Sequence, residues 1–229
     1  YYTDYCTADP ANCFEWGAQF VNDSGNLINP SQFIRGTEKL FIDLAYGTAE
    51  VLQLRDMVHE FFMRELELWV ETDVDAISFM DDWGTQERLL ISPRMWREIY
   101  KPLYAEYCRL IHSKGKAVFM HSDGHISAIY PDLIEIGLDC FNPFQPEVMD
   151  IHYCKREYGR HLTFYGGIST QQVLPRVKPP ELMRVIREMI ATIGADGGYI
   201  VAPTHSIPRD VPPENIVAFI ETVQGQQAG

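Results

Sequence analysis

The sequence has little positive charge, and it lacks a long apolar run. Its 229 residues include 19 lysines and arginines against 32 aspartates and glutamates, which gives a formal net charge of −13 at pH 7. A protein that neutralises a nucleic-acid backbone needs a basic face, and the sequence has no cluster of lysine and arginine to form one. The same acidic balance argues against binding to an anionic membrane surface. No apolar stretch approaches the roughly 20 residues of a membrane-spanning helix. We therefore expect neither a nucleic-acid partner nor a membrane partner.

Cysteine is also scarce, and no CxxC pair occurs among the five residues Cys6, Cys13, Cys108, Cys140 and Cys154. An odd number without paired spacing predicts reduced, mostly buried thiols rather than a disulfide framework. The opening segment YYTDYCTADPANC lacks the basic and apolar parts of a secretory signal peptide. These features predict a cytoplasmic protein. The GxSxG and P-loop signatures are absent as well, so the sequence offers no motif for a serine hydrolase or a P-loop nucleotide site.

From residue 73 onward, apolar runs of the β type alternate with amphipathic helical patterns. Ser92 and Pro93 suit the N-cap and first position of a helix that we expect to end near Ser113. Such alternation predicts βαβ units and a parallel sheet. The expected strands lie within 75–84, 116–124, 139–145, 162–169 and 198–205, and the other expected helices lie near 36–45, 48–71, 126–137, 148–158, 179–194 and 212–223.

We expect a single domain over 1–229, with an irregular and helical N-terminal part over 1–72 and repeated strand–helix units over 73–229. Within the N-terminal part, residues 1–33 are expected to be irregular. Five units can form an open sheet or the later part of an eight-fold barrel. The barrel is favoured because polar residues follow each strand at the same end, where barrel enzymes place their chemistry. An open α/β sheet would bind ligands at that end too.

His121 and Asp123 follow the second predicted strand, and His205 follows the fifth. Alternate residues of a strand point the same way, so His121 and Asp123 can share one target. Two imidazoles and a carboxylate suit zinc or another divalent metal. Two alternatives stay open. The residues can act without a metal, or Asp123 can cap the helix at Ile126 while His121 forms a hydrogen bond in the core.

Asp81 and Asp82 place two carboxylates at the end of the first predicted strand. Neighbouring carboxylates can raise one pKa and so suit acid–base chemistry, although an acidic loop with one capping aspartate is the alternative. Gly166 and Gly167 allow a ligand to approach the backbone closely, although a tight turn explains them as well. Trp83 lies beside these positions and could form part of the wall of a ligand pocket or belong to the core.

Five segments resemble, in order, the uroporphyrinogen decarboxylase superfamily over roughly residues 35–225. They read DAISFMDDWGTQERLLISPRMWREIYKPLY, KAVFMHSDGHI, IEIGLDCFNPFQPEVMD, LTFYGGISTQQVLP and GYIVAPTHSIPRDVPPENIVAFIETV. That superfamily contains the haem-pathway decarboxylase and cobalamin-linked methyltransferases. The resemblance implies an α/β fold, a (β/α)8 TIM-type barrel. Since only five strand–helix units are readable, either residues 1–72 supply the remaining strands or up to three strands are missing.

The methyltransferase branch has His-x-Cys after one strand and Cys after the last strand, and these ligands bind a zinc ion that activates a thiol. The matching positions here are His121, Asp123 and His205. Because a carboxylate and an imidazole replace the thiolates, the resemblance implies a harder metal site or a different methyl donor or acceptor.

The resemblance thus implies a corrinoid-linked methyltransferase or demethylase that moves a methyl group between a small molecule and a corrinoid protein. A zinc ion or another divalent metal would be the resident cofactor, and the corrinoid would come with the partner protein. The expected catalytic residues are Asp81, Asp82 and His205, and the expected substrate-binding residues are Trp83, Asn142, Gln145, Gly166 and Gly167.

Two other functions stay open. A uroporphyrinogen decarboxylase would need no cofactor and would place His205 and Asp82 near a tetrapyrrole. The arginines that hold the substrate carboxylates in that branch are not found, and Arg35 does not match them. A truncated, non-catalytic barrel that binds a ligand or a partner is the third reading. Exposed sheet edges would then favour a homo-oligomer.

Overall fold

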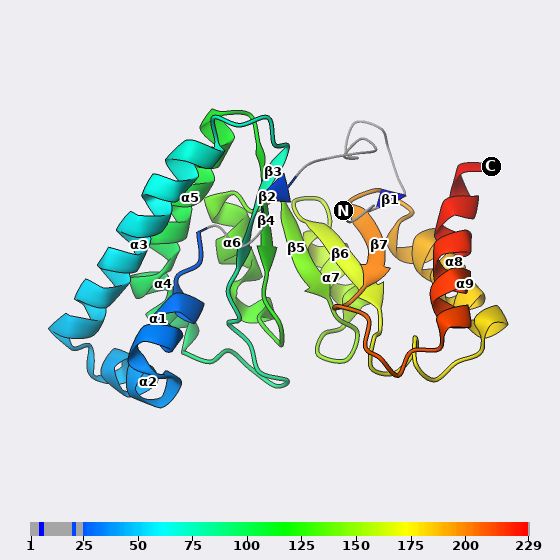
Figure 1. Ribbon diagram of the computed structural model, residues 1–229, viewed down its shortest axis with the longest axis horizontal. Helices are drawn as coiled ribbons and strands as arrows, with labels where there is room; N and C mark the ends of the chain where they lie inside the picture. Colours follow the sequence, from blue (N-terminus) through cyan, green and yellow to red (C-terminus); the bar gives the residue numbers. More distant parts are fainter. Residues whose placement is uncertain (1–4, 7–19, 22–24, 229) are drawn as a thin grey trace. The chain divides into compact units, whose positions relative to one another are not determined.

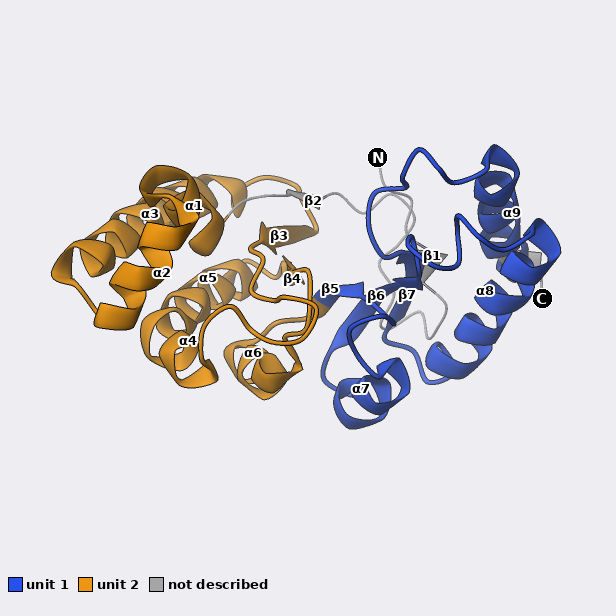
Figure 2. Ribbon diagram, turned by 90° about the horizontal axis from the view of Figure 1, so that it is seen from below, with its two compact units in different colours: residues 1–17, 141–229 blue, residues 18–140 orange. Residues whose placement is uncertain are grey.

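In the computed structural model, the described residues 5–6, 20–21 and 25–228 form α/β structure (Figure 1). Contacts group the chain into two compact units, which Figure 2 colours separately. Unit 1 contains residues 1–17 and 141–229, and unit 2 contains residues 18–140. The single domain expected from the sequence stays a prediction, and each unit is described by itself.

Unit 2 contains three strands in the order β4-β3-β2, and neighbouring strands run parallel. The register of β3 and β4 pairs Met80 with His121, so the carboxyl ends of these strands are level. The strands of the unit are β2 (Phe20–Val21), β3 (Ala76–Met80) and β4 (Ala117–His121), and its helices are α1 (Ile28–Arg35), α2 (Thr37–Tyr46), α3 (Ala49–Trp69), α4 (Pro93–Ile99), α5 (Lys101–Ser113), the 3₁₀ turn η2 (Ser127–Ile129) and α6 (Tyr130–Ile136).

The helix predicted from Ser92 to Ser113 is interrupted at Tyr100 and forms α4 and α5 instead. Ser92 is the N-cap, as predicted, because its hydroxyl accepts the Met95 N–H at 3.1 Å. The interruption follows from Pro102, which has no N–H to donate to the preceding turn. The helix predicted over 48–71 is confirmed as α3.

Unit 1 contains four strands in the order β1-β7-β6-β5. β6 and β7 run parallel, and their register pairs Phe164 with Tyr199, whereas β1 is antiparallel to β7. Figure 1 shows α8 and α9 side by side. The strands of the unit are β1 (Tyr5–Cys6), β5 (Cys140–Phe144), β6 (Thr163–Ile168) and β7 (Tyr199–Pro203), and its helices are α7 (Ile151–Tyr158), α8 (Pro179–Ile193), α9 (Pro213–Gln224) and the 3₁₀ turn η3 (Gly225–Ala228).

The five strands predicted from residue 73 onward are confirmed as β3 to β7. The N-terminal part differs from its prediction, since residues 28–35 form α1 rather than irregular chain, and residues 5–6 and 20–21 form short strands. The rest of 1–24 lies outside the described residues. The sequence did not predict α1, because the group that caps its N-terminus is distant. That group is the carboxylate of Asp81, 53 residues after Ile28.

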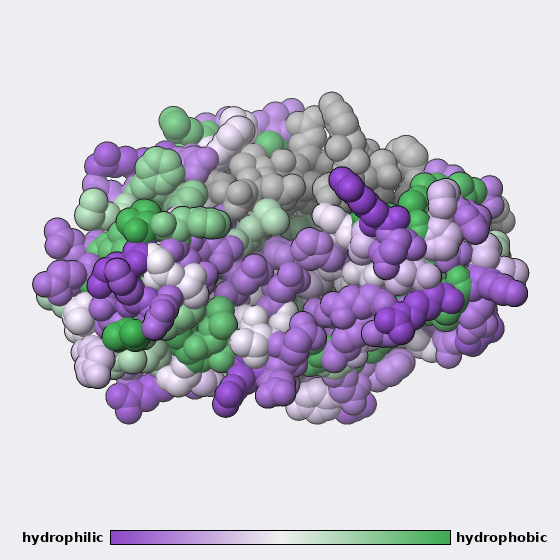
Figure 3. All heavy atoms as spheres, turned by 60° about the horizontal axis from the view of Figure 1, so that its bottom comes forward, coloured by the Kyte–Doolittle hydropathy of each residue, from purple (hydrophilic) through white to green (hydrophobic). Residues whose placement is uncertain are grey.

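Three of the five cysteines are buried free thiols, as predicted: Cys108, Cys140 and Cys154. Burial raises the pKa of the Cys108 thiol to about 12, so this thiol stays protonated at neutral pH. The side chains of Cys6 and Cys13 lie outside the described residues. On the face shown in Figure 3, apolar and hydrophilic surface alternate in small areas. None of the described helices is both long enough and apolar enough to cross a membrane.

Candidate active site at the strand ends

His121 and two carboxylates lie close together where β3 and β4 end. Nε2 of His121 is 3.6 Å from Oδ1 of Asp123 and 3.9 Å from Oδ1 of Asp82. The backbone N–H of Asp123 donates to the same Oδ1 of Asp82 at 2.9 Å. The imidazole is mostly buried, with 15% of its side chain exposed, while both carboxylates are about half exposed. The structure thus brings two predicted site residues, Asp82 and Asp123, close to the imidazole of a third, His121.

Two glycines hold the loops after β3 and β4 against each other. A Cβ on Gly124 would lie 2.5 Å from the carbonyl carbon of Gly84, and a Cβ on Gly84 would lie 2.6 Å from the carbonyl oxygen of Asp123. Gly124 also has a φ of +85°, a conformation that side chains other than glycine rarely adopt. Sequence reasoning missed this contact, although the repeated pattern of an acidic loop ending in glycine, DDWG and HSDG, was a signal for it.

Hydrogen bonds between the two loops support the glycine contact. The buried hydroxyl of Ser122 accepts the N–H of Trp83 at 2.9 Å. The N–H of His125 donates to the carbonyl of Thr85 at 2.7 Å. These bonds hold the loop of Asp82 against the loop of Asp123. The backbone therefore brings the two carboxylates close together.

Asp81 has a different environment from Asp82, although the two are adjacent in the sequence. Its side chain is fully buried, and its carboxylate accepts the N–H groups of Ile28 at 3.1 Å and Asn29 at 3.0 Å. The N–H of Leu27 and the hydroxyl of Tyr104 also donate to it. Asp81 therefore caps the N-terminus of α1, and burial raises its pKa to about 6. The carboxylate of Asp81 therefore faces the protein interior, and its predicted catalytic role stays a prediction.

Trp83 likewise lies in the interior. Its side chain is fully buried, its ring packs at 4.6 Å from that of Tyr100, and its indole N–H donates to Tyr104 at 3.0 Å. Trp96 lies beside the same group of rings, 6.3 Å from Trp83. A substrate could reach Trp83 only by displacing these rings. Trp83 therefore packs in the interior, and its predicted substrate contact stays a prediction.

The two glycines of β6 also have packing reasons. A Cβ on Gly166 would lie 2.9 Å from the backbone nitrogen of Phe144, and a Cβ on Gly167 would lie 2.3 Å from the hydroxyl oxygen of Tyr199. That hydroxyl donates to the carbonyl of Gly166 at 2.9 Å. These contacts give both glycines a packing reason, and the ligand approach predicted for them stays a prediction.

Asn142 and Gln145 belong to the end of β5 in unit 1. Asn142 is half-buried, and its side-chain amide donates to the carbonyl of Tyr165 at 3.1 Å. Gln145 is buried. Their predicted substrate contacts stay predictions.

His205 follows β7 and is exposed. Its Nδ1 accepts the N–H of Ser206 at 2.8 Å, so in the neutral imidazole the proton belongs to Nε2. In this tautomer His205 is a hydrogen-bond donor through Nε2. Binding a metal through Nε2 would need the Ser206 N–H to turn away. The local geometry of His205 thus suits its predicted catalytic role better than its predicted metal role.

Glu147 and Ser169 are a pair that sequence reasoning missed. They follow β5 and β6 in unit 1, and the hydroxyl of Ser169 donates to Oε1 of Glu147. Oε2 of Glu147 is buried and has no hydrogen-bond partner among the described residues. A buried carboxylate oxygen without a donor is costly and marks a place where a ligand group or a water molecule binds. The only signal in the sequence was the acidic residue in QPEVMD.

Comparisons with known proteins bear on the fold and the family. A family model described as uroporphyrinogen decarboxylase (URO-D) matches residues 26–226. A similar solved structure, a methyltransferase from Methanosarcina mazei, has a TM-score of 0.74 and 16% sequence identity. The match covers 94% of this chain and 60% of that chain, so the chain spans about 60% of its length. No match to a curated protein was found.

The predicted α/β fold of the TIM-barrel type is confirmed, with five parallel strand–helix units in the described part of the chain. At 16% identity the structural likeness shows the fold and leaves the reaction open. The arrangement at the ends of β3 and β4 can bind a divalent cation or move a proton, because an imidazole nitrogen lies close to two carboxylate oxygens, at 3.6 and 3.9 Å.

Proposed function

Because the chain belongs to the uroporphyrinogen decarboxylase family, we propose that it is an enzyme that moves a methyl group between a small molecule and a corrinoid protein. One observation carries the proposal: Nε2 of His121 lies 3.9 Å from a carboxylate oxygen of Asp82 and 3.6 Å from one of Asp123. A decarboxylase for a tetrapyrrole would instead need cationic groups for several substrate carboxylates. The fold shared with a protein called a methyltransferase supports the same choice.

We further propose that His121 and Asp123 bind a divalent metal ion, either zinc or a harder ion. Their ligand atoms are 3.6 Å apart, and one ion at about 2.1 Å from each would span that separation at a near-tetrahedral angle. When bound, such an ion supplies Lewis-acid chemistry, which polarises a substrate atom.

The chain's own groups have separate roles in this proposal. Asp82 accepts the backbone N–H of Asp123 and so orients that loop, and its half-exposed carboxylate can accept a proton from the methyl acceptor. His205 donates a hydrogen bond to the substrate through Nε2.

The proposal is tested with methylcobalamin as the corrinoid probe. The purified chain is mixed with methylcobalamin and a panel of small thiols and amines, and demethylation is followed by the change in the corrinoid absorbance spectrum. We expect turnover with at least one acceptor and at least a roughly 100-fold loss of rate in Asp82→Asn. His161→Ala, which changes an exposed histidine of unit 1, is the matched control. Turnover that is unchanged in Asp82→Asn would contradict the role of this carboxylate.

Decarboxylation of uroporphyrinogen is the second candidate, because the matching family model carries that name. The same protein preparation is incubated with uroporphyrinogen under anaerobic conditions, and products with fewer carboxylates are separated by chromatography. Turnover of the tetrapyrrole without turnover of methylcobalamin would replace the first proposal by the second.

A further inference from the structure

A tight turn directly after β5 sets the position of Glu147 in unit 1. The N–H of Val148 donates to the carbonyl of Gln145 at 3.2 Å, and Pro146 occupies the second position of this turn, where its fixed φ is favoured. Val148 is buried and anchors the turn on its apolar side. The turn therefore carries the Glu147 carboxylate at the carboxyl end of β5, the end of a sheet at which α/β proteins bind ligands.

Ser169, which directly follows β6, orients that carboxylate. Its hydroxyl oxygen accepts the N–H groups of Gln171 at 3.2 Å and Gln172 at 2.8 Å. Because these two donors use both lone pairs of the oxygen, the single hydroxyl proton is left for Oε1 of Glu147, and this is the bond that the structure contains. Ser169 is buried, so water competes little for the bond.

The end of β7 holds the loop of Ser169 in place. The N–H of Thr170 donates to the hydroxyl oxygen of Thr204 at 3.2 Å, and the two hydroxyl oxygens lie 3.1 Å apart. Both threonines are buried, and the N–H of Thr204 donates to the carbonyl of Ile168 at 2.9 Å. The Glu147 carboxylate is therefore oriented before a ligand arrives, which lowers the entropic cost of binding.

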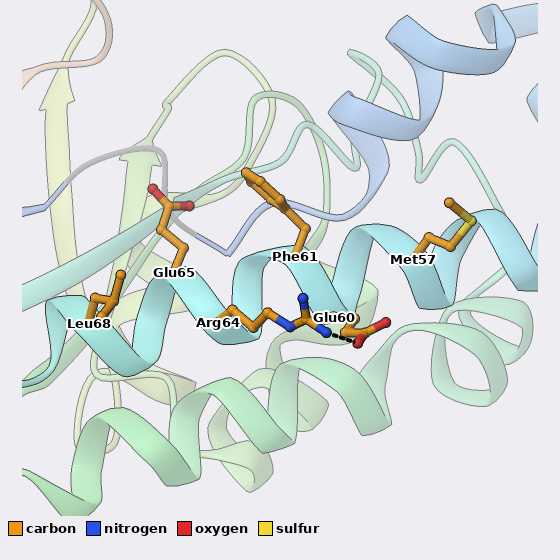
Figure 4. Close-up of a pocket in the computed structure, with 6 residues that line it drawn as sticks. All are labelled: Met57, Glu60, Phe61, Arg64, Glu65 and Leu68. Atoms are coloured by element: carbon orange, nitrogen blue, oxygen red, sulfur yellow. Dashed lines mark hydrogen bonds and ion pairs between the residues drawn. The ribbon is translucent and has the colours of Figure 1, made fainter.

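The charge of Glu147 has no partner in the part of the chain that the structure describes. An exposed glutamate of α3 shows the contrast, because in the surface hollow over that helix Glu60 forms an ion pair with Arg64 (Figure 4). No ion pair between described residues includes Glu147, and its buried Oε2 accepts no hydrogen bond from them. A glutamate is ordinarily ionised at neutral pH, and a buried charge without a partner is costly. This favours a cationic ligand over water or a neutral donor.

The number of available oxygens selects the kind of cation. A guanidinium group prefers to bind both oxygens of a carboxylate with two parallel N–H donors, but Ser169 already occupies Oε1 of Glu147. A divalent metal ion takes about four or more ligands, and this carboxylate offers a single oxygen. An ammonium group binds through one N–H to one acceptor, so it fits Oε2 best.

We propose that Oε2 of Glu147 binds the ammonium group of a small organic cation, with Ser169 as a positioning residue. Oε2 is covered, but Glu147 as a residue is half-buried, so a small turn about its soft terminal torsion opens this oxygen to a ligand. The proposal is independent of the proposed reaction, because it needs neither a metal nor a corrinoid.

The first test measures the thermal unfolding of the purified chain with ethylammonium chloride, against potassium chloride at the same concentration. A ligand that binds the folded chain raises Tm, and we expect a rise of at least about 3 °C at about 50 mM ethylammonium. Tetramethylammonium, a cation without an N–H, and guanidinium should each give a smaller rise. No rise with ethylammonium, or a rise as large with either of the other cations, would overturn the proposal.

Glu147→Gln tests the charge, because it keeps the size of the side chain and an oxygen for Ser169. We expect ethylammonium to bind at least about 10-fold more weakly, while the variant without ligand is at least as stable as the wild type, since an unpaired charge is removed. Glu221→Gln, which changes an exposed glutamate of α9, is the matched control and should bind like the wild type. Unchanged binding in Glu147→Gln would overturn the proposal. Failure of this variant to fold would do the same, because the charge would then be structural.

Ser169→Ala tests the positioning role through selectivity. Without the Ser169 hydroxyl, both oxygens of Glu147 become available to a two-pronged donor. Guanidinium should therefore gain on ethylammonium by at least about threefold in the ratio of the two dissociation constants. This ratio compares two ligands on one variant, so a general loss of stability does not change it. An unchanged ratio would overturn the role of Ser169.

Discussion

Nε2 of His121 lies 3.6 Å from Oδ1 of Asp123, at the carboxyl end of one strand. The two side chains come from alternate residues, so they share one side of the chain. Asp82 reaches the same imidazole from the neighbouring strand, because the β3–β4 register pairs Met80 with His121. The backbone, and above all the contact of Gly84 with Gly124, keeps these three groups together.

Gly124→Ala should damage the site and the fold. The new Cβ would lie 2.5 Å from the carbonyl carbon of Gly84, and we expect a loss of about 3 kcal/mol in the free energy of unfolding, measured in urea. Gly115→Ala is the control, because Gly115 also has a positive φ, +69°, but open space around its Cβ position. That variant should lose only about 1 kcal/mol. Equal losses in both variants would show that the contact between the loops is unimportant.

Gly167→Ala should lose stability through a clash inside the protein. The added Cβ would meet the hydroxyl oxygen of Tyr199, and we expect a cost of about 2 kcal/mol. The double variant with Tyr199→Phe should recover part of that cost, because it removes the oxygen, and a double-mutant cycle measures the coupling. Because Gly167 has a φ of +89°, alanine is strained there even without the clash. A double variant that recovers none of the lost stability would therefore contradict the contact with Tyr199.

The buried carboxylate of Asp81 should make stability depend on pH. Its pKa is raised from 3.8 to about 6, so folding favours its protonated form. This contribution to stability is full below about pH 4 and is lost as the pH rises through 6. The free energy of unfolding of the wild type, minus that of Asp81→Asn, should therefore fall by about 2 kcal/mol between pH 4 and pH 7. A difference that rises with pH would contradict the stated direction.

The tautomer of His205 can be measured directly. Because its Nδ1 accepts the Ser206 N–H, nitrogen NMR above about pH 8, where an ordinary imidazole is neutral, should find the proton on Nε2. His205→Gln, whose amide group can donate from a similar position, should retain more methyl-transfer activity than His205→Ala. A proton on Nδ1 would instead favour metal binding through Nε2.

The repeated strands and helices were predictable because they depend on local periodicity and capping. Ser92 signals its helix within three residues, and α8 shows its apolar spacing within one segment. The interruption at Tyr100 and the existence of α1 were not predicted. In both cases one group decides against the local pattern. Pro102 lies within an amphipathic helical pattern, and Asp81 follows a strand that is distant in the sequence.

The sequence predicted where the candidate site lies better than it predicted what each residue does there. Strand ends predicted Asp82, His121 and Asp123 as site residues; the structure brings their side chains close together, and their roles stay predictions. Asp81 and Trp83 share the same motif but turn into the interior. Sequence position alone cannot separate neighbouring residues that face opposite sides of a loop. Glu147 was missed because only its burial distinguishes it from an ordinary surface acid.

Metal content tests the central claim most directly. Protein purified without chelators is analysed by mass spectrometry for bound metals, as wild type, His121→Ala, Asp123→Ala, His205→Ala and the control His161→Ala. The account predicts about one equivalent of zinc or iron in the wild type and the control, and its loss in His121→Ala and Asp123→Ala. The same loss in His205→Ala would make His205 the third ligand. A wild type without metal, or metal that stays bound in His121→Ala, would contradict the account.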